Sequence, residues 1–321
     1  MKVLQFTDLH EDTSRLENII NHLEKYEDEI DVVLNTGDTT GSDGKNKENF
    51  ENKINNEVNS NSKLSNLENK IQDFMNDNNI NNQSDLFQLD DDLKEKYFNM
   101  ESEKSQLLSD ITEKAYEDSI NKLKPYFKTI DDSVDHFIGI AGNHDLNLIY
   151  DSLGDYMTFI DKEEKYEVDM NENSKMIFKG LINSPEIPKK HRLIPEDYHI
   201  NYQSSSPIED NYSDDLKELL KNSQEKEKNR LNGFDCDIML FHKDPRFDSN
   251  KYGDSCQVSH DFYDNSNASS SYNGHIHGGY VHVDEEGKVR MNPGINHFFQ
   301  VEYKDDKSIK SIKIYRYESS S

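Results

Sequence analysis

The first forty residues alternate between short apolar runs and polar segments, a pattern typical of a β-α-β unit. Val3 to Phe6 predicts one strand, and residues 31–35, with three successive apolar side chains, predict a second. Apolar positions recur at helical spacing between them (Leu16, Ile19, Ile20 and Leu23), and Ser14 with Glu17 fits a capping box. Polar residues follow each strand. In open α/β sheets, that carboxyl edge is where ligands bind.

Residues 41–124 differ in composition from the segment before them. Asn, Asp, Glu, Ser and Lys dominate here, and the apolar residues keep only a loose helical period. We expect an acidic, Asn-rich helical insertion, frayed near residues 76–83, within a single domain that spans 1–321. Three roles stay open for it: a solvated arm without chemistry, a lid, or an arm that joins copies into a homo-oligomer.

The remaining chain returns to apolar strands separated by turns. The expected strands are 136–141, 176–182, 237–241, 280–283, 288–291, 298–303 and 308–317, of which the last four form two hairpins. A polar linker is expected over 184–211, an acidic helix over 214–229, and a polar, partly helical approach over 261–271. Strands mixed with helices predict an α/β (α+β) fold.

Charge and composition narrow the possible partners. The 37 Lys and Arg residues against 64 Asp and Glu give a formal net charge of -27, which repels phosphate backbones and anionic membranes. Unaided, extended nucleic-acid binding is therefore not expected. The low hydrophobic fraction of 32% fits a very polar surface with polar insertions, and a salt-rich cytoplasm is one hypothesis for the acidity.

The predicted location is the cytoplasm. Cys236 and Cys256 are too few for a disulfide framework, which favours a reducing compartment. The first residues do not resemble a signal peptide, and no apolar run approaches the roughly 20 residues that a membrane span needs. We therefore expect no membrane partner.

Five short segments offer side chains suited to divalent metals, each after an apolar strand or a turn. They are Asp8-Leu9-His10, Gly37-Asp38, Gly142-Asn143-His144-Asp145, His242 and Gly274-His275-Ile276-His277. Mixed imidazole and carboxylate ligands suit Mn, Fe and Zn, whereas Mg and Ca prefer oxygen alone. A carboxylate such as Asp38 can bridge two ions about 3.5–4 Å apart, and a hydroxide held between them is a nucleophile at neutral pH.

Each segment alone has an ordinary explanation. Asp-x-His is common in surface loops, Gly-Asp is a common bend, and a lone histidine such as His242 is more often structural than a ligand. Gly-Asn-His-Asp also fits a polar turn. The order of all five at element ends favours a metal site, since the other histidines have no comparable setting. His22, His191 and His199 are expected at the surface, and His282 and His297 in or beside strands.

Together, these segments resemble the calcineurin-like metallophosphoesterase superfamily. Asn292-Pro293-Gly294, which follows the last His-x-His, also resembles that family, and the C-terminal part is most similar to a prokaryotic, phosphodiesterase-related branch. The resemblance covers both ends of the chain and none of residues 41–124. It implies a four-layer αββα sandwich and a metal-dependent enzyme that hydrolyses a phosphodiester or phosphomonoester.

The resemblance also implies residue roles and cofactors. The cofactors would be two divalent metal ions, with Mn expected and Fe or Zn as alternatives, and no organic cofactor. One metal would be held by Asp8, His10, Asp38 and His277, and the other by Asp38, Asn143, His242 and His275. His144 would protonate the leaving oxygen and Asp145 would orient it, which agrees with the need for a general acid that is not itself a ligand.

Two departures from the family pattern concern the loops. Thr39-Thr40 stands where many members carry a second aspartate, and Lys243 and Arg246 follow His242. Either cation could contact the substrate phosphate, although a solvated loop charge is the simpler interpretation. The expected substrate is a small phosphoester. The alternatives are a DNA-repair-type nuclease, which the acidity disfavours, and a non-catalytic scaffold, which the complete ligand set disfavours.

Overall fold

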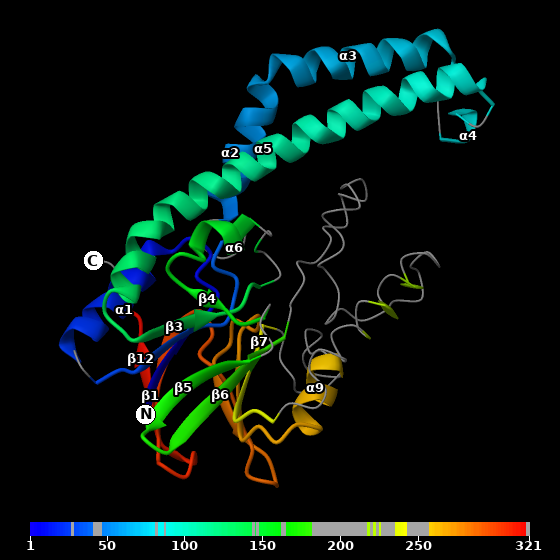
Figure 1. Cartoon of the computed structure of the whole chain (residues 1–321). Coiled ribbons are helices and arrows are strands. Elements are labelled where there is room, and N and C mark those ends of the chain that lie inside the picture. Colours follow the sequence, from blue (N-terminus) through cyan, green and yellow to red (C-terminus); the bar gives the residue numbers. More distant parts are fainter. Residues whose placement is uncertain are drawn as a thin grey trace.

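The computed structural model describes residues 1–26, 29–40, 47–80, 83–86, 88–142, 145, 148–161, 165–181, 217–218, 221–222, 225, 235–242 and 257–318. Two six-stranded sheets pack face to face, and helices cover their outer faces (Figure 1). This arrangement confirms the expected four-layer α/β sandwich. No helix among these residues is both long and apolar enough to cross a bilayer.

The first sheet contains the N-terminal β-α-β unit and the last hairpin. Its order is β12-β11-β1-β2-β3-β4, with β1 to β4 parallel and β11 and β12 antiparallel. The strands are β1 (Lys2–Phe6), β2 (Val32–Asn35), β3 (His136–Gly139), β4 (Thr158–Phe159), β11 (His297–Tyr303) and β12 (Ile309–Arg316). Phe6 pairs with Asn35 and Asn35 with Gly139, so the carboxyl ends of three neighbouring strands are level.

The second sheet has the order β5-β6-β7-β8-β10-β9. Its strands are β5 (Tyr166–Asn171), β6 (Ser174–Gly180), β7 (Ile238–Phe241), β8 (Ser270–Asn273), β9 (Tyr280–Val283) and β10 (Val289–Asn292). Strands β6, β7, β8 and β10 are parallel, and Phe241 pairs with Asn273. His242 and Gly274 therefore leave neighbouring strands at the same edge.

Three apolar clusters mark the three interfaces between the layers. Alternation along the strands produces them: Val3 faces the other sheet, whereas Leu4 faces the helices. The first cluster lies between the first sheet and helices α1 (Thr13–Lys25), α5 (Asp91–Asp131) and α6 (Leu148–Leu153). The second lies between the sheets, and the third packs the second sheet against α9 (Gln257–Asp264).

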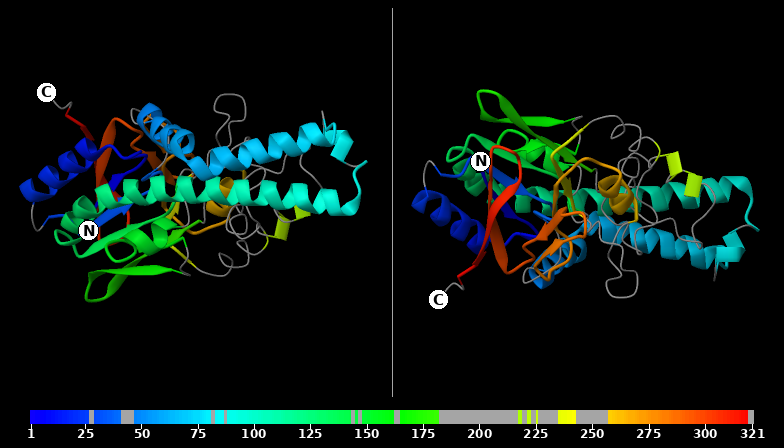
Figure 2. Two further views of the ribbon diagram at one scale, coloured as in Figure 1. Left: turned by 90° about the horizontal axis from the view of Figure 1, so that it is seen from above. Right: turned by 90° about the horizontal axis from the view of Figure 1, so that it is seen from below.

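Helices α2 (Lys47–Ser60), α3 (Ser62–Asp77), α4 (Gln83–Leu86) and α5 make up a segment that we call the helical arm. Figures 1 and 2 show α3 beside the N-terminal half of α5, both extending beyond the sheets. Leu64, Leu67, Ile71 and Phe74 are the buried residues of α3. The C-terminal half of α5 instead contributes Ile120, Leu123 and Phe127 to the first core cluster. One end of the helical arm is thus part of the sandwich.

Several sequence expectations need correction. The cap of α1 is Asp12, whose carboxylate accepts from both the backbone and the hydroxyl of Ser14, so the predicted capping box is wrong. A carboxylate is a stronger acceptor than a hydroxyl at a helix N-terminus. His22 is buried beside Gln300 rather than exposed. Residues 76–80 form a capped helix end with Ile80 buried, not a frayed segment.

The element boundaries were less predictable than the elements. Helix α5 continues past the expected end of the insertion at Lys124, through Pro125, to Asp131. Strand β5, which pairs with β6, was missed because its alternation is weak. The linker expected over 184–211, His191, His199, Lys243 and Arg246 lie outside the described residues, as does most of the helix expected over 214–229.

Candidate metal centre

Six of the seven predicted metal ligands meet at the carboxyl edge shared by the two sheets. Their donor atoms form two groups, and the atoms of each group lie within 4.8 Å of one another. The first group is Asp8, His10 and His277, and the second is Asp38, His242 and His275. Each combines one carboxylate with two imidazoles. The seventh ligand, Asn143, lies outside the described residues, as does His144.

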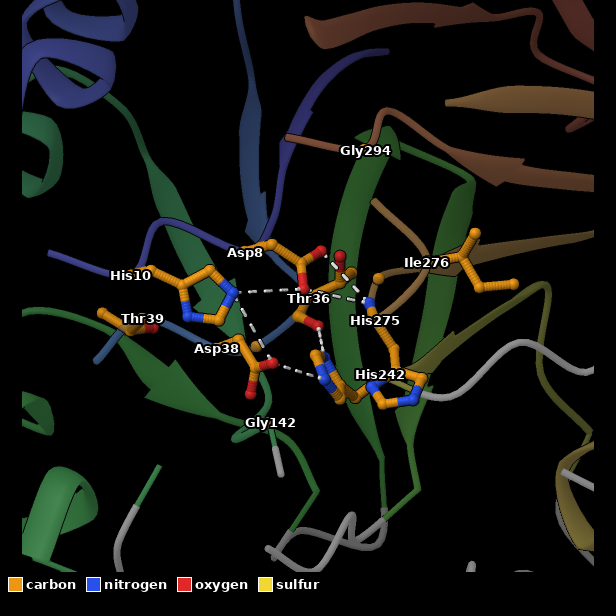
Figure 3. A network of polar contacts seen from close by, with 12 residues as sticks. Asp8, His10, Thr36, Asp38, Thr39, Gly142, His242, His275, Ile276 and Gly294 are labelled. Atoms are coloured by element: carbon orange, nitrogen blue, oxygen red, sulfur yellow. Dashed lines mark hydrogen bonds and ion pairs between the residues drawn. The ribbon is translucent and has the colours of Figure 1, made fainter. Parts of the chain in front are cut away.

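The two groups adjoin each other through Asp38. Its Oδ2 atom is 3.1 Å from Nε2 of His242 and 4.0 Å from Nε2 of His10, which belongs to the other group (Figure 3). Asp8 and Asp38 are almost completely buried, as are His10 and His242. His10 and His277 meet edge to face at 5.5 Å between ring centroids, and His242 and His275 do so at 5.3 Å.

The backbone at the centre is held in an uncommon conformation. Asp8, His10, Glu11, Asp38 and His275 all have positive φ angles, between 45° and 64°. Such angles cost non-glycine residues about 1–3 kcal/mol each, and they persist only where surrounding contacts enforce them. Here the amides of Asp8, His10 and Glu11 donate to the carbonyls of Gly37, Asp38 and Thr39, so the loops after β1 and β2 hold each other.

Two of the candidate ligands are oriented by contacts outside the centre. Nδ1 of His242 lies 2.8 Å from the Thr36 carbonyl and therefore donates to it, which leaves Nε2 directed at Asp38. Both carboxylate oxygens of Asp8 accept from the amide of His275, at 3.1 Å each. Metal-binding histidines commonly donate their second ring nitrogen to a carbonyl in this way. The Thr36 contact could not be predicted from the sequence, because it uses a backbone carbonyl, which every residue has.

The pKa values of both Asp8 and His242 are raised, but for different reasons. Burial raises the pKa of Asp8 to about 6, with the charge of Asp38 adding to the effect. Burial lowers the pKa of His242, but the charge and hydrogen bond of Asp38 outweigh it and raise the pKa to about 9. Metal binding by His242 would therefore compete with protonation of its ring.

Glycines next to the candidate ligands allow the loops to approach closely. A Cβ atom on Gly142 would lie 2.1 Å from the amide nitrogen of Asp38, and one on Gly274 would lie 2.2 Å from Oγ1 of Thr7. One on Gly37, whose φ is +96°, would lie 2.7 Å from Nδ1 of His242. These close approaches explain why glycine precedes Asp38, Asn143 and His275 in the sequence, since any side chain there would collide with a neighbouring loop.

Asp145 is tied to the loop that carries Asp38. Its buried carboxylate accepts from the amides of Thr39 (3.2 Å), Thr40 (2.8 Å) and Gly142 (2.9 Å), and from the Thr40 hydroxyl (2.9 Å). Burial raises its pKa, as does the charge of Asp38, and these hydrogen bonds oppose the shift. Asp145 therefore joins the loops after β2 and β3, a contact that sequence reasoning missed. Its predicted role in orienting His144 stays a prediction.

The turn at residues 292–294 supports the loop that carries His275 and His277. Asn292 is buried, and its side-chain amide donates to the carbonyls of Gly274 (2.8 Å) and Ile276 (3.0 Å). Its carboxamide oxygen accepts from the amide of Gly294 at 2.7 Å. This turn entered the sequence argument only by resemblance, and the hydrogen bonds explain why an asparagine stands there.

Comparison with known proteins identifies the family. Among solved structures, the chain is similar to a protein of Thermus thermophilus (10% identity, TM-score 0.47, 99% of both chains covered). It is also similar to a dimetal phosphatase of Danio rerio (11%, 0.40, 99% of both) and to a 5'-nucleotidase of Candida albicans (9%, 0.39, 99% of this chain and 52% of that chain). No curated protein matches the chain in sequence. The calcineurin-like phosphoesterase model matches residues 1–279, and the chain therefore belongs to that family.

Proposed function

We propose that this protein hydrolyses a phosphodiester or phosphomonoester bond in a small substrate, using two divalent metal ions. The observation that carries the proposal is the pair of adjoining ligand groups, each with one carboxylate and two imidazoles, at one buried edge. The family is one of dinuclear metal enzymes. When bound, the two ions supply a nucleophile at neutral pH and neutralise charge on the phosphate oxygens.

The chemistry of the donor atoms suits such ions. Mixed imidazole and carboxylate donors suit Mn, and also Fe and Zn. We assign Asp8, His10 and His277 to one ion, with Asp38 shared. His242 and His275 would hold the second ion, and Asn143 is predicted to join them. The Thr36 carbonyl already presents Nε2 of His242 in the orientation a ligand needs.

The remaining roles belong to the chain's own acid and base groups. His144 is proposed to protonate the leaving oxygen, which would let an alcohol depart as a neutral molecule. The next residue, Asp145, is anchored by four hydrogen bonds, so this part of the loop after β3 is firmly connected to the Asp38 loop. The net charge of -27 favours a small substrate over a nucleic-acid strand.

The proposal predicts a strict metal requirement. Chelator-treated protein should be inactive on bis-p-nitrophenyl phosphate and p-nitrophenyl phosphate, and Mn²⁺ should restore hydrolysis of at least one of them. Fe²⁺ and Zn²⁺, tested in parallel, would rank the metals. His144→Ala should lose most of the restored activity, whereas His282→Ala, at an exposed position of β9, should keep it.

Single-stranded and duplex DNA belong in the same assay, because they test the nuclease alternative. Cleavage of DNA with no hydrolysis of the small esters would replace the proposed substrate class. Protein that gains no activity on any of these substrates with any of the three metals would contradict the proposed function.

A further inference from the structure

Gln5 is a polar residue in the apolar layer between the two sheets. Along β1, Val3 packs into the second core cluster, and Gln5, two residues later, points the same way. The Gln5 side chain is fully buried. Burying a carboxamide costs free energy unless its polar atoms are hydrogen-bonded. An apolar residue would fill this layer at no such cost, so the hydrogen bonds of Gln5 are the feature that distinguishes it here.

The amide group of Gln5 has two hydrogens, and both are donated at the carboxyl edge of the sheets. Nε2 donates to Oγ1 of Thr36 at 3.2 Å and to the Asn273 carbonyl at 2.9 Å. Thr36 follows β2 in the first sheet, and Asn273 is the last residue of β8 in the second sheet. The Thr36 hydroxyl also donates to the Asn273 carbonyl, at 3.0 Å. One buried side chain therefore joins β1 to the ends of β2 and β8.

The two acceptors adjoin ligands of the second group. The Thr36 carbonyl accepts from Nδ1 of His242 (Figure 3), and Asn273 stands two residues before His275. Asp38, the third member of the group, stands two residues after Thr36. The second group thus takes its carboxylate from the first sheet and its two imidazoles from the second. The placement of one sheet on the other at this edge therefore decides whether the three donor atoms converge.

We propose that Gln5 is a positioning residue whose hydrogen bonds between the sheets hold the second ligand group together for its metal ion. Close-packed interiors transmit small displacements, so a shift of β8 against β2 moves the donor atoms apart. The first group depends less on this contact, because Asp8 and His10 share one loop, which the loop after β2 holds. The inference rests on the proposed two-metal function.

A second polar contact joins the same two sheets at the other end of β8. Oη of Tyr303, on β11, lies 2.9 Å from Oγ of Ser270 and 2.8 Å from Oη of Tyr272, and all three side chains are buried. Ser270 is the first residue of β8, whereas Asn273 is the last. Tyr303→Phe is therefore a matched control. Like loss of the Gln5 amide, it removes two buried hydrogen bonds where the sheets meet, but at the end away from the metal centre.

Mn²⁺ binding separates this role from general stabilisation. Titration of wild-type protein, followed by calorimetry and EPR, should show two equivalents and a spin-coupled pair. Gln5→Met keeps an unbranched side chain without an N–H donor, and Thr36→Val removes the hydroxyl but keeps the carbonyl that orients His242. In each variant one equivalent should weaken roughly tenfold, the lower end of the effect of losing an outer support of a ligand. The other should bind as before, so an uncoupled Mn²⁺ signal should appear at low metal concentration.

Tyr303→Phe should lower the melting temperature about as much as Gln5→Met does, yet bind both Mn²⁺ equivalents with wild-type affinity. Circular dichroism identifies the variants that fold. The inference is overturned if folded Gln5→Met or Thr36→Val protein binds both equivalents like wild type, or if Tyr303→Phe weakens binding as much. Either result would leave the proposed function standing. Wild-type protein that binds no Mn²⁺ pair would overturn the proposed function and this inference with it.

Discussion

Replacement of Asp38 by asparagine should reduce Mn²⁺-dependent phosphoester hydrolysis about a thousandfold or more. The carboxylate lies 3.1 Å from His242 and 4.0 Å from His10, so it adjoins both ligand groups. Asparagine fills the same space without the negative charge. Metal ions in such sites supply several kcal/mol of transition-state stabilisation, and each 1.36 kcal/mol is tenfold in rate. Loss of the shared ligand should remove most of that contribution.

The measurement is kcat/KM on bis-p-nitrophenyl phosphate with saturating Mn²⁺, together with the number of Mn²⁺ ions bound. Asp305→Asn, in the exposed turn between β11 and β12, removes one negative charge away from the centre and should behave like wild type. An Asp38→Asn protein that keeps two Mn²⁺ ions and near-normal kcat/KM would show that Asp38 is not shared between them.

Gly142→Ala should damage the centre without removing any candidate ligand. The new Cβ would lie 2.1 Å from the amide nitrogen of Asp38 and 2.2 Å from its Oδ1 atom, distances at which atoms must move. The amide nitrogen belongs to the backbone, so the Asp38 loop itself has to shift, and the Asp38 carboxylate has to move as well. Forcing an extra carbon into a packed site costs about 1–3 kcal/mol of stability. We expect a lower melting temperature and at least a hundredfold loss of kcat/KM, since about 1 Å of misplacement can cost that much.

Gly278→Ala is the control for this prediction. Gly278 lies in the same segment as His277, yet a Cβ there would meet nothing within 4 Å. This variant should retain activity and stability. If Gly142→Ala retained wild-type kcat/KM and Mn²⁺ affinity, the close approach of Gly142 to Asp38 would not be required for the site.

The order of the five segments along the chain predicted a metal site, because parallel strands bring their carboxyl ends to one edge. The division of its ligands into two groups came from the family resemblance. Asp8 and Asp38 follow two paired strands of the first sheet whose ends are level, and His242 follows a strand of the second sheet whose end is level with that of β8. The local pattern was less informative where several side chains could accept the hydrogen bonds of the same helix N-terminus. Ser14 looked like a helix cap, but the carboxylate of Asp12 takes that position.

Contacts between distant segments were not predictable from local pattern. His22 was expected at the surface, yet Phe298, Tyr315 and Gln300 from the last hairpin cover it. The packing of Ile120, Leu123 and Phe127 of α5 against the first sheet is a second such contact. It depends on α5 continuing into the sandwich, where the polar composition of residues 41–124 gave no indication of a core helix.

Anomalous diffraction from crystals of the Mn²⁺-loaded protein tests the two-metal site most directly. The expected result is two peaks about 3.5–4 Å apart. One should lie among Asp8, His10 and His277, and the other among Asp38, His242 and His275, with the Asp38 carboxylate between them. A single peak, or two peaks away from these side chains, would contradict the two-metal site and the hydrolytic function proposed from it.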